Sequence, residues 1–257
     1  MDLRKYMAFL LVAGLMVTAG CGSKDEDEGF GQGGGGTNTT ASATALGTAS
    51  ITGKVTLSGK APAAAVISMD ADPVCKSQHS TAPKDETVVA NAKGDLANVF
   101  VYVTDAGSTA APTTPVTLTQ RGCMYSPHVF GVQVNQPIEI VNDDPTLHNV
   151  HCMAVTNDAF NVGQPSQGMK TEKKFTKPEV LVKFKCDVHS WMHCFAGVTN
   201  NPFYSISGTD GSFKISQLPA GTYTVVAVHE KYGASAPQKV TVTDGGTQSV
   251  NFTFAAQ

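Results

Sequence analysis

The chain has 257 residues, a formal net charge of −3 and 15% charged residues. Because it has no excess of basic residues with which to neutralise phosphates, we expect no nucleic-acid partner. Its length is sufficient for two small β domains or one large one.

The first 21 residues have the pattern of an export signal. Arg4 and Lys5 precede an apolar run over residues 7–17, which is too short to span a membrane. The run leads into the sequence TAGC at residues 18–21, which resembles a bacterial lipoprotein box. This resemblance implies a signal peptide over residues 1–21, cleavage before Cys21 and lipidation of its thiol. Ordinary signal cleavage nearby is the alternative.

Residues 22–49 are expected to form a disordered tether. They contain an acidic run at residues 25–28, a glycine-rich run at residues 31–36 and a tract of small residues. Such a composition cannot bury enough apolar surface to offset the entropy of an ordered chain. With lipid on Cys21, the tether would hold the folded part off a membrane in the bacterial cell envelope, on the periplasmic side or at the cell surface.

The rest of the chain is predicted to be all-β. Glycine and proline interrupt it throughout, and apolar residues alternate or occur in short runs instead of recurring at helical spacing. Residues 50–57 form the first expected strand, with Ile51, Val55 and Leu57 on one face. Residues 97–103 form another strand of this kind.

A cluster of metal-binding residue types is the main functional signal. Cys186, His189 and Met192 lie within seven residues, and His148 lies on an earlier segment. One thiolate, two imidazoles and a thioether are the ligands that copper prefers in electron-transfer sites. Strand alternation directs Cys186 to the same face as the apolar residues before it, and it directs His148 inward. We therefore predict one copper ion held by these four residues, although a cysteine with two histidines would also accept zinc.

The same residues resemble the cupredoxins, and within them the amicyanin-like proteins with a short Cys-x2-His-x2-Met loop. The resemblance covers roughly residues 115–200 and implies a Greek-key sandwich over residues 111–200. It implies that His148, Cys186, His189 and Met192 bind copper. It also implies that Asn149 hydrogen-bonds across to the ligand loop.

Two features depart from the cupredoxin pattern, and one end of the site is expected to meet a partner. Ser190 stands where a proline would stiffen the loop, and His193 directly follows Met192 as a possible rival axial ligand. The resemblance implies that His189 is the exposed edge through which electrons pass to a redox partner protein. Trp191 would contribute to the docking surface there or cover the site.

The C-terminal segment resembles a second family. The runs at residues 207–215 and 218–225, each with a tight turn between apolar alternations, are similar to carboxypeptidase regulatory-like domains. That resemblance implies a small Ig-like or transthyretin-like β-sandwich. Because strands of the same kind occur at residues 50–57 and 97–103, we expect a discontinuous domain of residues 50–110 and 201–257, with the copper module inserted.

Four cysteines remain after Cys21 and Cys186 are assigned. In an oxidising envelope, four cysteines favour two disulfides, and three pairings are possible. We prefer Cys75 with Cys123 and Cys152 with Cys194, because Cys152 and Cys194 lie close in sequence to ligands that must converge. A binuclear copper site with Cys194 as the second thiolate is the less favoured alternative.

These patterns predict an envelope-anchored, mononuclear type 1-like copper protein that transfers electrons. One alternative is a copper storage or delivery protein, and another is a surface binding module in which the metal is secondary. No enzyme is expected, because four protein ligands leave no coordination position for a substrate.

Overall fold

The computed structural model describes residues 44–256. The predicted signal peptide, the lipidation site at Cys21 and the tether as far as residue 43 lie outside the described residues. Within the described range, none of the helices has the length and apolar character that crossing a bilayer would need. Thr44 and Gly47 donate backbone hydrogen bonds to Ser108 and Gln217, so the tether ends earlier than residue 49.

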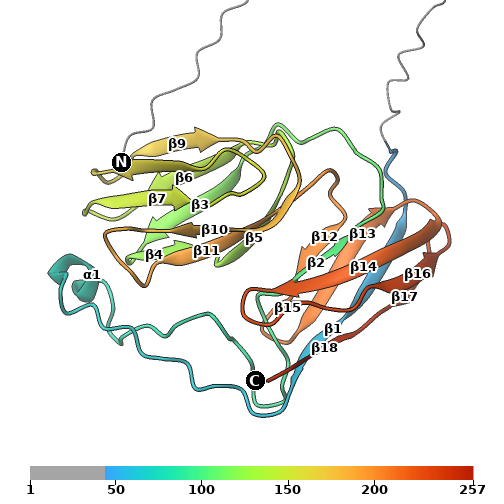
Figure 1. The fold of residues 1–257 in the computed structure, drawn as a ribbon, viewed down its shortest axis with the longest axis horizontal. Helices are drawn as coiled ribbons and strands as arrows, with labels where there is room; N and C mark the ends of the chain where they lie inside the picture. The colour runs from blue at the N-terminus through green and yellow to red at the C-terminus, as the bar shows by residue number, and fades with distance from the viewer. Residues whose placement is uncertain (1–43, 257) are drawn as a thin grey trace, which may run out of the picture. The chain divides into compact units, whose positions relative to one another are not determined.

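The described chain consists of eighteen strands and one short helix, which confirms the predicted all-β class (Figure 1). The strands form four sheets that enclose two main cores. We call the two groups of strands the terminal sandwich and the central sandwich. The terminal sandwich contains β1 and β2 together with β12–β18, and the central sandwich contains β3–β11.

The terminal sandwich is built from both ends of the described chain. One sheet has the order β13-β1-β17 with β18 also on β1, and the other has the order β12-β2-β14-β15 with β16 on β14. Its strands are β1 (Ala49–Ser58), β2 (Phe100–Val103), β12 (Tyr204–Ile206), β13 (Ser212–Leu218), β14 (Gly221–His229), β15 (Gly233–Ala234), β16 (Gln238–Val242), β17 (Thr247–Ser249) and β18 (Phe252–Ala255). Ile51, Val55 and Leu57 are buried, as their alternation predicts. Strands before and after the central sandwich thus share one core, as the expected discontinuous domain requires. The limits of that domain stay a prediction.

The central sandwich packs two sheets face to face. Their orders are β5-β11-β10-β7-β8 and β4-β3-β6-β9. The strands are β3 (Val116–Arg121), β4 (Met124–Ser126), β5 (Val129–Gln133), β6 (Ile138–Asn142), β7 (His148–Cys152), β8 (Phe160–Gln164), β9 (Lys170–Lys173), β10 (Glu179–Lys185) and β11 (His193–Thr199). Leu118, Ile140, Val150 and Phe184 are among the buried residues between them.

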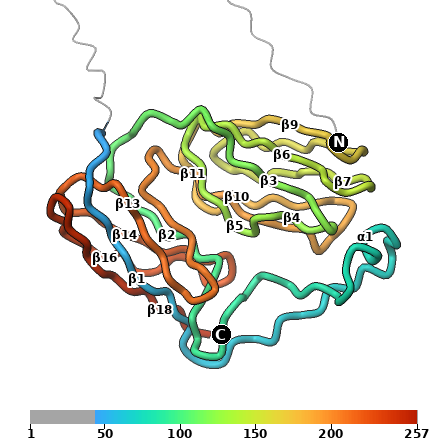
Figure 2. The backbone as a smooth tube through the Cα atoms, turned by 180° about the vertical axis from the view of Figure 1, so that it is seen from behind, coloured from blue at the N-terminus to red at the C-terminus, as the bar shows by residue number. Residues whose placement is uncertain are grey.

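A long connection between β1 and β2 reaches the central sandwich. Figure 2 shows it leaving β1, carrying α1 (Pro73–Ser77) and returning to β2. The side chain of Asp72 caps α1 by accepting hydrogen bonds from the backbone N–H groups of Val74 and Cys75. The sequence predicts that all of residues 50–110 belong to the terminal sandwich. Ile67, Met69 and Cys75 instead pack in the core of the central sandwich.

The two sandwiches meet at a glycine in β11. A methyl group on Gly197 would lie 2.2 Å from Cζ of Phe100, a fully buried residue of β2. Because Phe100 has no free space to move into, Gly197→Ala should lower the free energy of unfolding by about 1–3 kcal/mol. Gly163→Ala in β8 is the matched control, since nothing lies within 4 Å of its added methyl group. Urea unfolding of both variants checks this, and equal stability of the two would contradict it.

Candidate metal centre

Three of the four predicted ligands lie together in the central sandwich. His148 begins β7, Cys186 directly follows β10, and His189 lies in the loop before β11. Nδ1 of His148 lies 3.0 Å from Nδ1 of His189, and Sγ of Cys186 lies 3.8 Å from the same His189 atom. All three residues are buried. The Nδ1 atoms and the sulfur therefore surround one small space.

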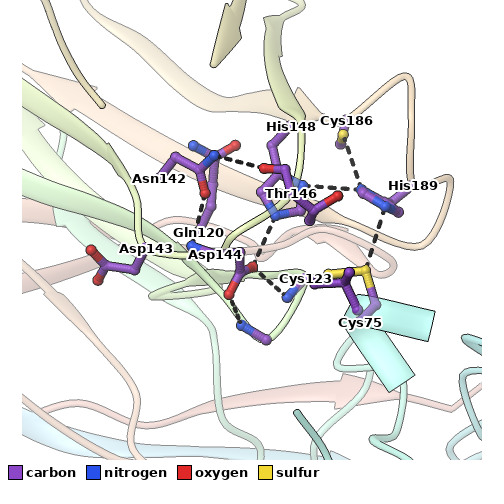
Figure 3. A network of polar contacts seen from close by, with 12 residues as sticks. Cys75, Gln120, Cys123, Asn142, Asp143, Asp144, Thr146, His148, Cys186 and His189 are labelled. Carbon is purple, nitrogen blue, oxygen red and sulfur yellow. Dashed lines mark hydrogen bonds and ion pairs between the residues drawn. A yellow bond between two sulfur atoms is a disulfide. The ribbon is translucent and has the colours of Figure 1, made fainter. Parts of the chain in front are cut away.

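The opposite nitrogen of each imidazole contacts a carboxylate. Nε2 of His148 lies 2.9 Å from Oδ2 of Asp144, which is fully buried (Figure 3). Nε2 of His189 lies 3.0 Å from Oδ2 of Asp72. A carboxylate on the outer nitrogen sets the tautomer of a histidine and orients its ring toward a metal. Asp144 is itself held by the backbone N–H groups of Gly122 and Cys123. The donor atoms are thus positioned by hydrogen bonds on their outer side.

Cys186 differs in its acidity from the other free cysteines of the described chain. Burial opposes its ionisation, but contacts with His148 and His189 outweigh burial and lower the pKa of the Cys186 thiol to about 5. Burial raises the pKa of Cys152 to about 11 and that of Cys194 well above its usual range. Because the thiolate is the form that binds metals, only Cys186 of these three is ready to act as a ligand at neutral pH.

His148 responds to the same charges in the opposite direction. Burial disfavours its charged form, but the Asp144 carboxylate and the Cys186 thiolate raise the pKa of His148 to about 9. Asp144 is also desolvated, yet its contact with His148 and two backbone hydrogen bonds keep its pKa below the usual value. The carboxylate and the thiolate thus both stabilise the charged form of His148.

Asn149 joins the two segments that carry the site. Its Oδ1 accepts a hydrogen bond from the backbone N–H of Asp187 at 2.6 Å and lies 3.3 Å from Sγ of Cys186. Its Nδ2 donates to Oδ2 of Asp187 at 3.0 Å. These contacts run from β7 to the ligand loop, as the sequence predicts for this residue.

The loop from Cys186 to Met192 is closed by its own backbone. The N–H of Cys186 donates to the carbonyl of Met192 at 3.1 Å, and the N–H of Met192 donates to the carbonyl of His189 at 2.9 Å. Met192 is fully buried in the same core as Cys186. The structure thus places Met192 beside the loop in the core, and its role as a ligand stays a prediction.

His193 is directed away from this site, which contradicts its expected role as a rival axial ligand. Its Nε2 lies 3.5 Å from Oε2 of Glu230, and its Nδ1 lies 3.1 Å from the carbonyl oxygen of Trp191. The physical reason is strand alternation, because Cys194 enters the core of the central sandwich and His193 faces the opposite side.

His189 is covered, so the expectation that it forms an exposed edge is wrong. Its side chain is only 3% exposed. The connection that carries α1 lies against it, with Oδ2 of Asp72 at 3.0 Å and Sγ of Cys75 at 3.4 Å from its Nε2. Trp191 adds to the cover: its ring centroid lies 5.2 Å from that of His189, and its Nε1 donates to the carbonyl of Cys123 at 2.9 Å.

One of the two preferred disulfides is confirmed and the other is wrong. Cys75 and Cys123 are bonded, whereas Cys152 and Cys194 are free and buried. Both free cysteines are in register with Phe184, from strands on opposite sides of β10. Two strand spacings separate their Cα atoms by about 9–10 Å, which exceeds the roughly 7 Å that a disulfide can bridge. The less favoured binuclear copper site is not supported either, because none of the clusters of possible ligands in residues 44–256 contains Cys194.

Sequence reasoning did not identify the two carboxylates. Asp144 lies in the turn at residues 142–145, four residues before His148, and its side chain is fully buried. Aspartate is common in turns because its side chain hydrogen-bonds to the backbone nearby, so its presence at this position did not indicate a contact with His148. Asp72 is 117 residues from His189 in sequence, and no local pattern connects them.

The donor atoms fit a single trigonal ion. With metal–nitrogen bonds near 2.0 Å and a metal–sulfur bond near 2.3 Å, ligands at 120° lie about 3.5 Å apart for two nitrogens and about 3.7 Å for nitrogen and sulfur. The observed separations of 3.0 and 3.8 Å are close to these values. One thiolate and two imidazoles in this arrangement suit copper, and they also accept zinc.

Comparisons with known proteins found one family profile and a set of solved structures that match. Residues 196–255 match the family profile of the carboxypeptidase regulatory-like domain, as predicted for the C-terminal segment. No curated protein matches the sequence. The solved structures that match include cupredoxins, the family that the central segment resembles.

Three of these structures give the scale of the likeness. A copper-containing nitrite reductase from Thermus scotoductus SA-01 is 24% identical, with 37% of this chain and 25% of that chain covered and a TM-score of 0.31. A purple cupredoxin from Nitrosopumilus maritimus is 22% identical over 33% of this chain and 99% of its own, with a TM-score of 0.29. An oxidized mutant of amicyanin is 17% identical over 38% of this chain and 97% of its own, with a TM-score of 0.30. Because these scores are low, the inference of copper rests on the side chains described above.

Proposed function

We propose that this chain is an envelope-anchored electron carrier with one copper ion. The observation that carries the proposal is the convergence of Sγ of Cys186 with the Nδ1 atoms of His148 and His189, while Nε2 of each imidazole contacts a carboxylate. Met192, buried in the same core, is the proposed axial ligand. Bound copper would supply one-electron oxidation and reduction at this position.

The protein's own residues favour electron transfer over catalysis. Asp144 and Asp72 hold the two imidazoles, and Asn149 joins β7 to the ligand loop, so the donors are fixed before any metal binds. A site whose ligands keep their positions suits both oxidation states of copper. Four protein ligands would leave no position for a substrate, and we therefore propose no enzymatic activity.

The setting of the proposed carrier follows from the N-terminal sequence. Residues 18–21 resemble a lipoprotein box, and lipid on Cys21 would anchor the protein in the cell envelope through the segment that precedes residue 44. The proposed partner is a redox protein that docks at the end of the central sandwich near Trp191. Because His189 is covered, electrons would pass through the residues that cover it.

Copper storage or delivery is the competing function, and it predicts different behaviour. A delivery site must release its ion readily, whereas all three converging ligands here are buried and His189 lies beneath α1. We therefore expect slow transfer of Cu(I) to a chelator. A surface binding module would retain its partner binding without any metal.

The test is to add one equivalent of Cu(II) to the exported part of the chain and record the visible spectrum. We expect an intense thiolate-to-copper band that is bleached by a mild reductant and restored by an oxidant over repeated cycles. Transfer of Cu(I) to a chelator within minutes would favour delivery. A colourless protein that keeps zinc in the presence of copper would overturn the proposal.

A further inference from the structure

A second cluster of possible ligands lies outside the candidate metal centre. His128 precedes β5, His193 is the first residue of β11, and Glu230 directly follows β14. One donor atom from each lies within 4.8 Å of the other two. The side chains of His128 and Glu230 are 4% and 8% exposed, and that of His193 is 18% exposed. Three buried or half-buried donors thus meet where the central and terminal sandwiches touch.

Glu230 directs its two oxygens at the two imidazoles. Its Oε1 contacts Nε2 of His128, and its Oε2 lies 3.5 Å from Nε2 of His193. Within residues 44–256, Glu230 forms ion pairs with these two histidines and with no lysine or arginine. The carboxylate is therefore left to be balanced by protons on the imidazoles or by a cation.

The contacts of His193 leave room for a cation. Its Nδ1 lies 3.1 Å from the carbonyl oxygen of Trp191, which can only accept a hydrogen bond. Its other ring nitrogen, Nε2, faces Oε2 of Glu230 at 3.5 Å, which is longer than a normal hydrogen bond. An ion between these two atoms could bind both.

The geometry matches that of a metal site. Two ligands at 2.0–2.1 Å from one tetrahedral ion lie about 3.3–3.4 Å apart, close to the 3.5 Å between His193 and Glu230. The hydrogen bond between His128 and Glu230 would be replaced by the ion. Nδ1 of His128 lies 3.8 Å from Oε2 of Glu86, so a carboxylate lies near the outer nitrogen of this ring but beyond hydrogen-bond distance.

We propose that His128, His193 and Glu230 bind a second metal ion, a divalent cation of the zinc class, with one coordination position left open. Two imidazoles and one carboxylate are ligands of mononuclear zinc sites. The ion would join β5 and β11 of the central sandwich to β14 of the terminal sandwich. It would be separate from the copper proposed above, because His193 and Met192 are adjacent in sequence but face opposite sides.

The test uses Zn²⁺ alone and a chain in which Cys186→Ser removes the thiolate of the first site. Equilibrium dialysis of Cys186→Ser is compared with that of Cys186→Ser/Glu230→Gln, which keeps the shape of the side chain and removes its charge. We expect the second variant to bind one equivalent of Zn²⁺ less, with affinity at this cluster reduced by about 100-fold or more, since even residues outside the ligand set contribute 10–100-fold. Glu172→Gln, an exposed carboxylate in β9, is the matched control and should leave the stoichiometry unchanged.

Co²⁺ provides a second readout, in the chain that keeps Cys186, because its spectrum separates the two sites. At the proposed cluster it should show ligand-field absorption without a thiolate charge-transfer band. Equal Zn²⁺ stoichiometry with and without Glu230→Gln would overturn the proposal, as would a thiolate band that accounts for all bound Co²⁺. If Glu230→Gln does not fold, His193→Gln at the most exposed of the three positions gives the same comparison. None of these outcomes depends on copper at Cys186.

Discussion

Replacing Cys186 with serine is expected to abolish the intense visible band of the copper-loaded protein and to weaken Cu(II) binding by at least about 100-fold. The band requires a thiolate bound to Cu(II), and a serine hydroxyl is neither ionised at neutral pH nor a soft ligand. Cys186 lies 3.8 Å from Nδ1 of His189, and its lowered pKa supplies the thiolate. Absorption spectra during Cu(II) titration measure both effects.

The other free cysteines give matched controls for this substitution. Cys152 and Cys194 are also buried thiols of the central sandwich. They belong to none of the clusters of possible ligands among residues 44–256. Cys152→Ser and Cys194→Ser should therefore keep the band, although each loses some packing. Loss of the band in either control together with its retention in Cys186→Ser would mean that a different thiol binds copper.

Removing the Cys75–Cys123 disulfide is expected to lower the free energy of unfolding and to uncover His189. The bond joins residues 48 apart in sequence. Loss of a cross-link over a loop of this length corresponds to about 4 kcal/mol in the chain-entropy description. The bond also holds α1 in place, where Asp72 and Cys75 contact His189. Without it, copper should pass to a chelator faster.

The measurement is urea unfolding of the wild-type chain and of Cys75→Ser/Cys123→Ser, each with and without a thiol reductant. The reductant should destabilise the wild-type chain and leave the double variant unaffected, because the variant has no disulfide to lose. Copper release to a chelator is followed in the same four samples. If the reductant changes neither the stability nor the release rate of the wild-type chain, the disulfide does not hold the cover over His189.

The inward direction of the candidate ligands could be predicted because it depends on short-range patterns. Strand alternation predicts Val180, Val182, Phe184 and Cys186 on one buried face, and the structure agrees for the last three. Val180 packs against a different cluster, because the pairing of β10 with β11 is irregular between Glu179 and Val182. The same periodicity directs His148 inward and leaves His151 at the edge, where it contacts Asp187. The spacing of Cys186 and His189 on one loop was likewise visible in the sequence.

The errors share a different cause. The Cys152–Cys194 pairing followed from nearness in sequence to converging ligands, but β10 lies between the strands that carry these cysteines. The expectation that His189 is exposed came from the resemblance to cupredoxins. That resemblance covers only residues 115–200 and so does not include the connection between β1 and β2. The rival role of His193 followed from adjacency to Met192, although neighbouring residues in a strand face opposite sides.

The sequence by itself determined the all-β class, the two cores, the inward direction of Cys186 and His148, and the Cys75–Cys123 pair as one of three possibilities. Only the tertiary structure decided that Asp144 and Asp72 hold the imidazoles, that α1 covers His189, and that His193 joins His128 and Glu230. The physical reason is distance along the chain. Side-chain direction within a strand is set by its own backbone, whereas Asp72 and His189, 117 residues apart, meet only when separate segments pack together.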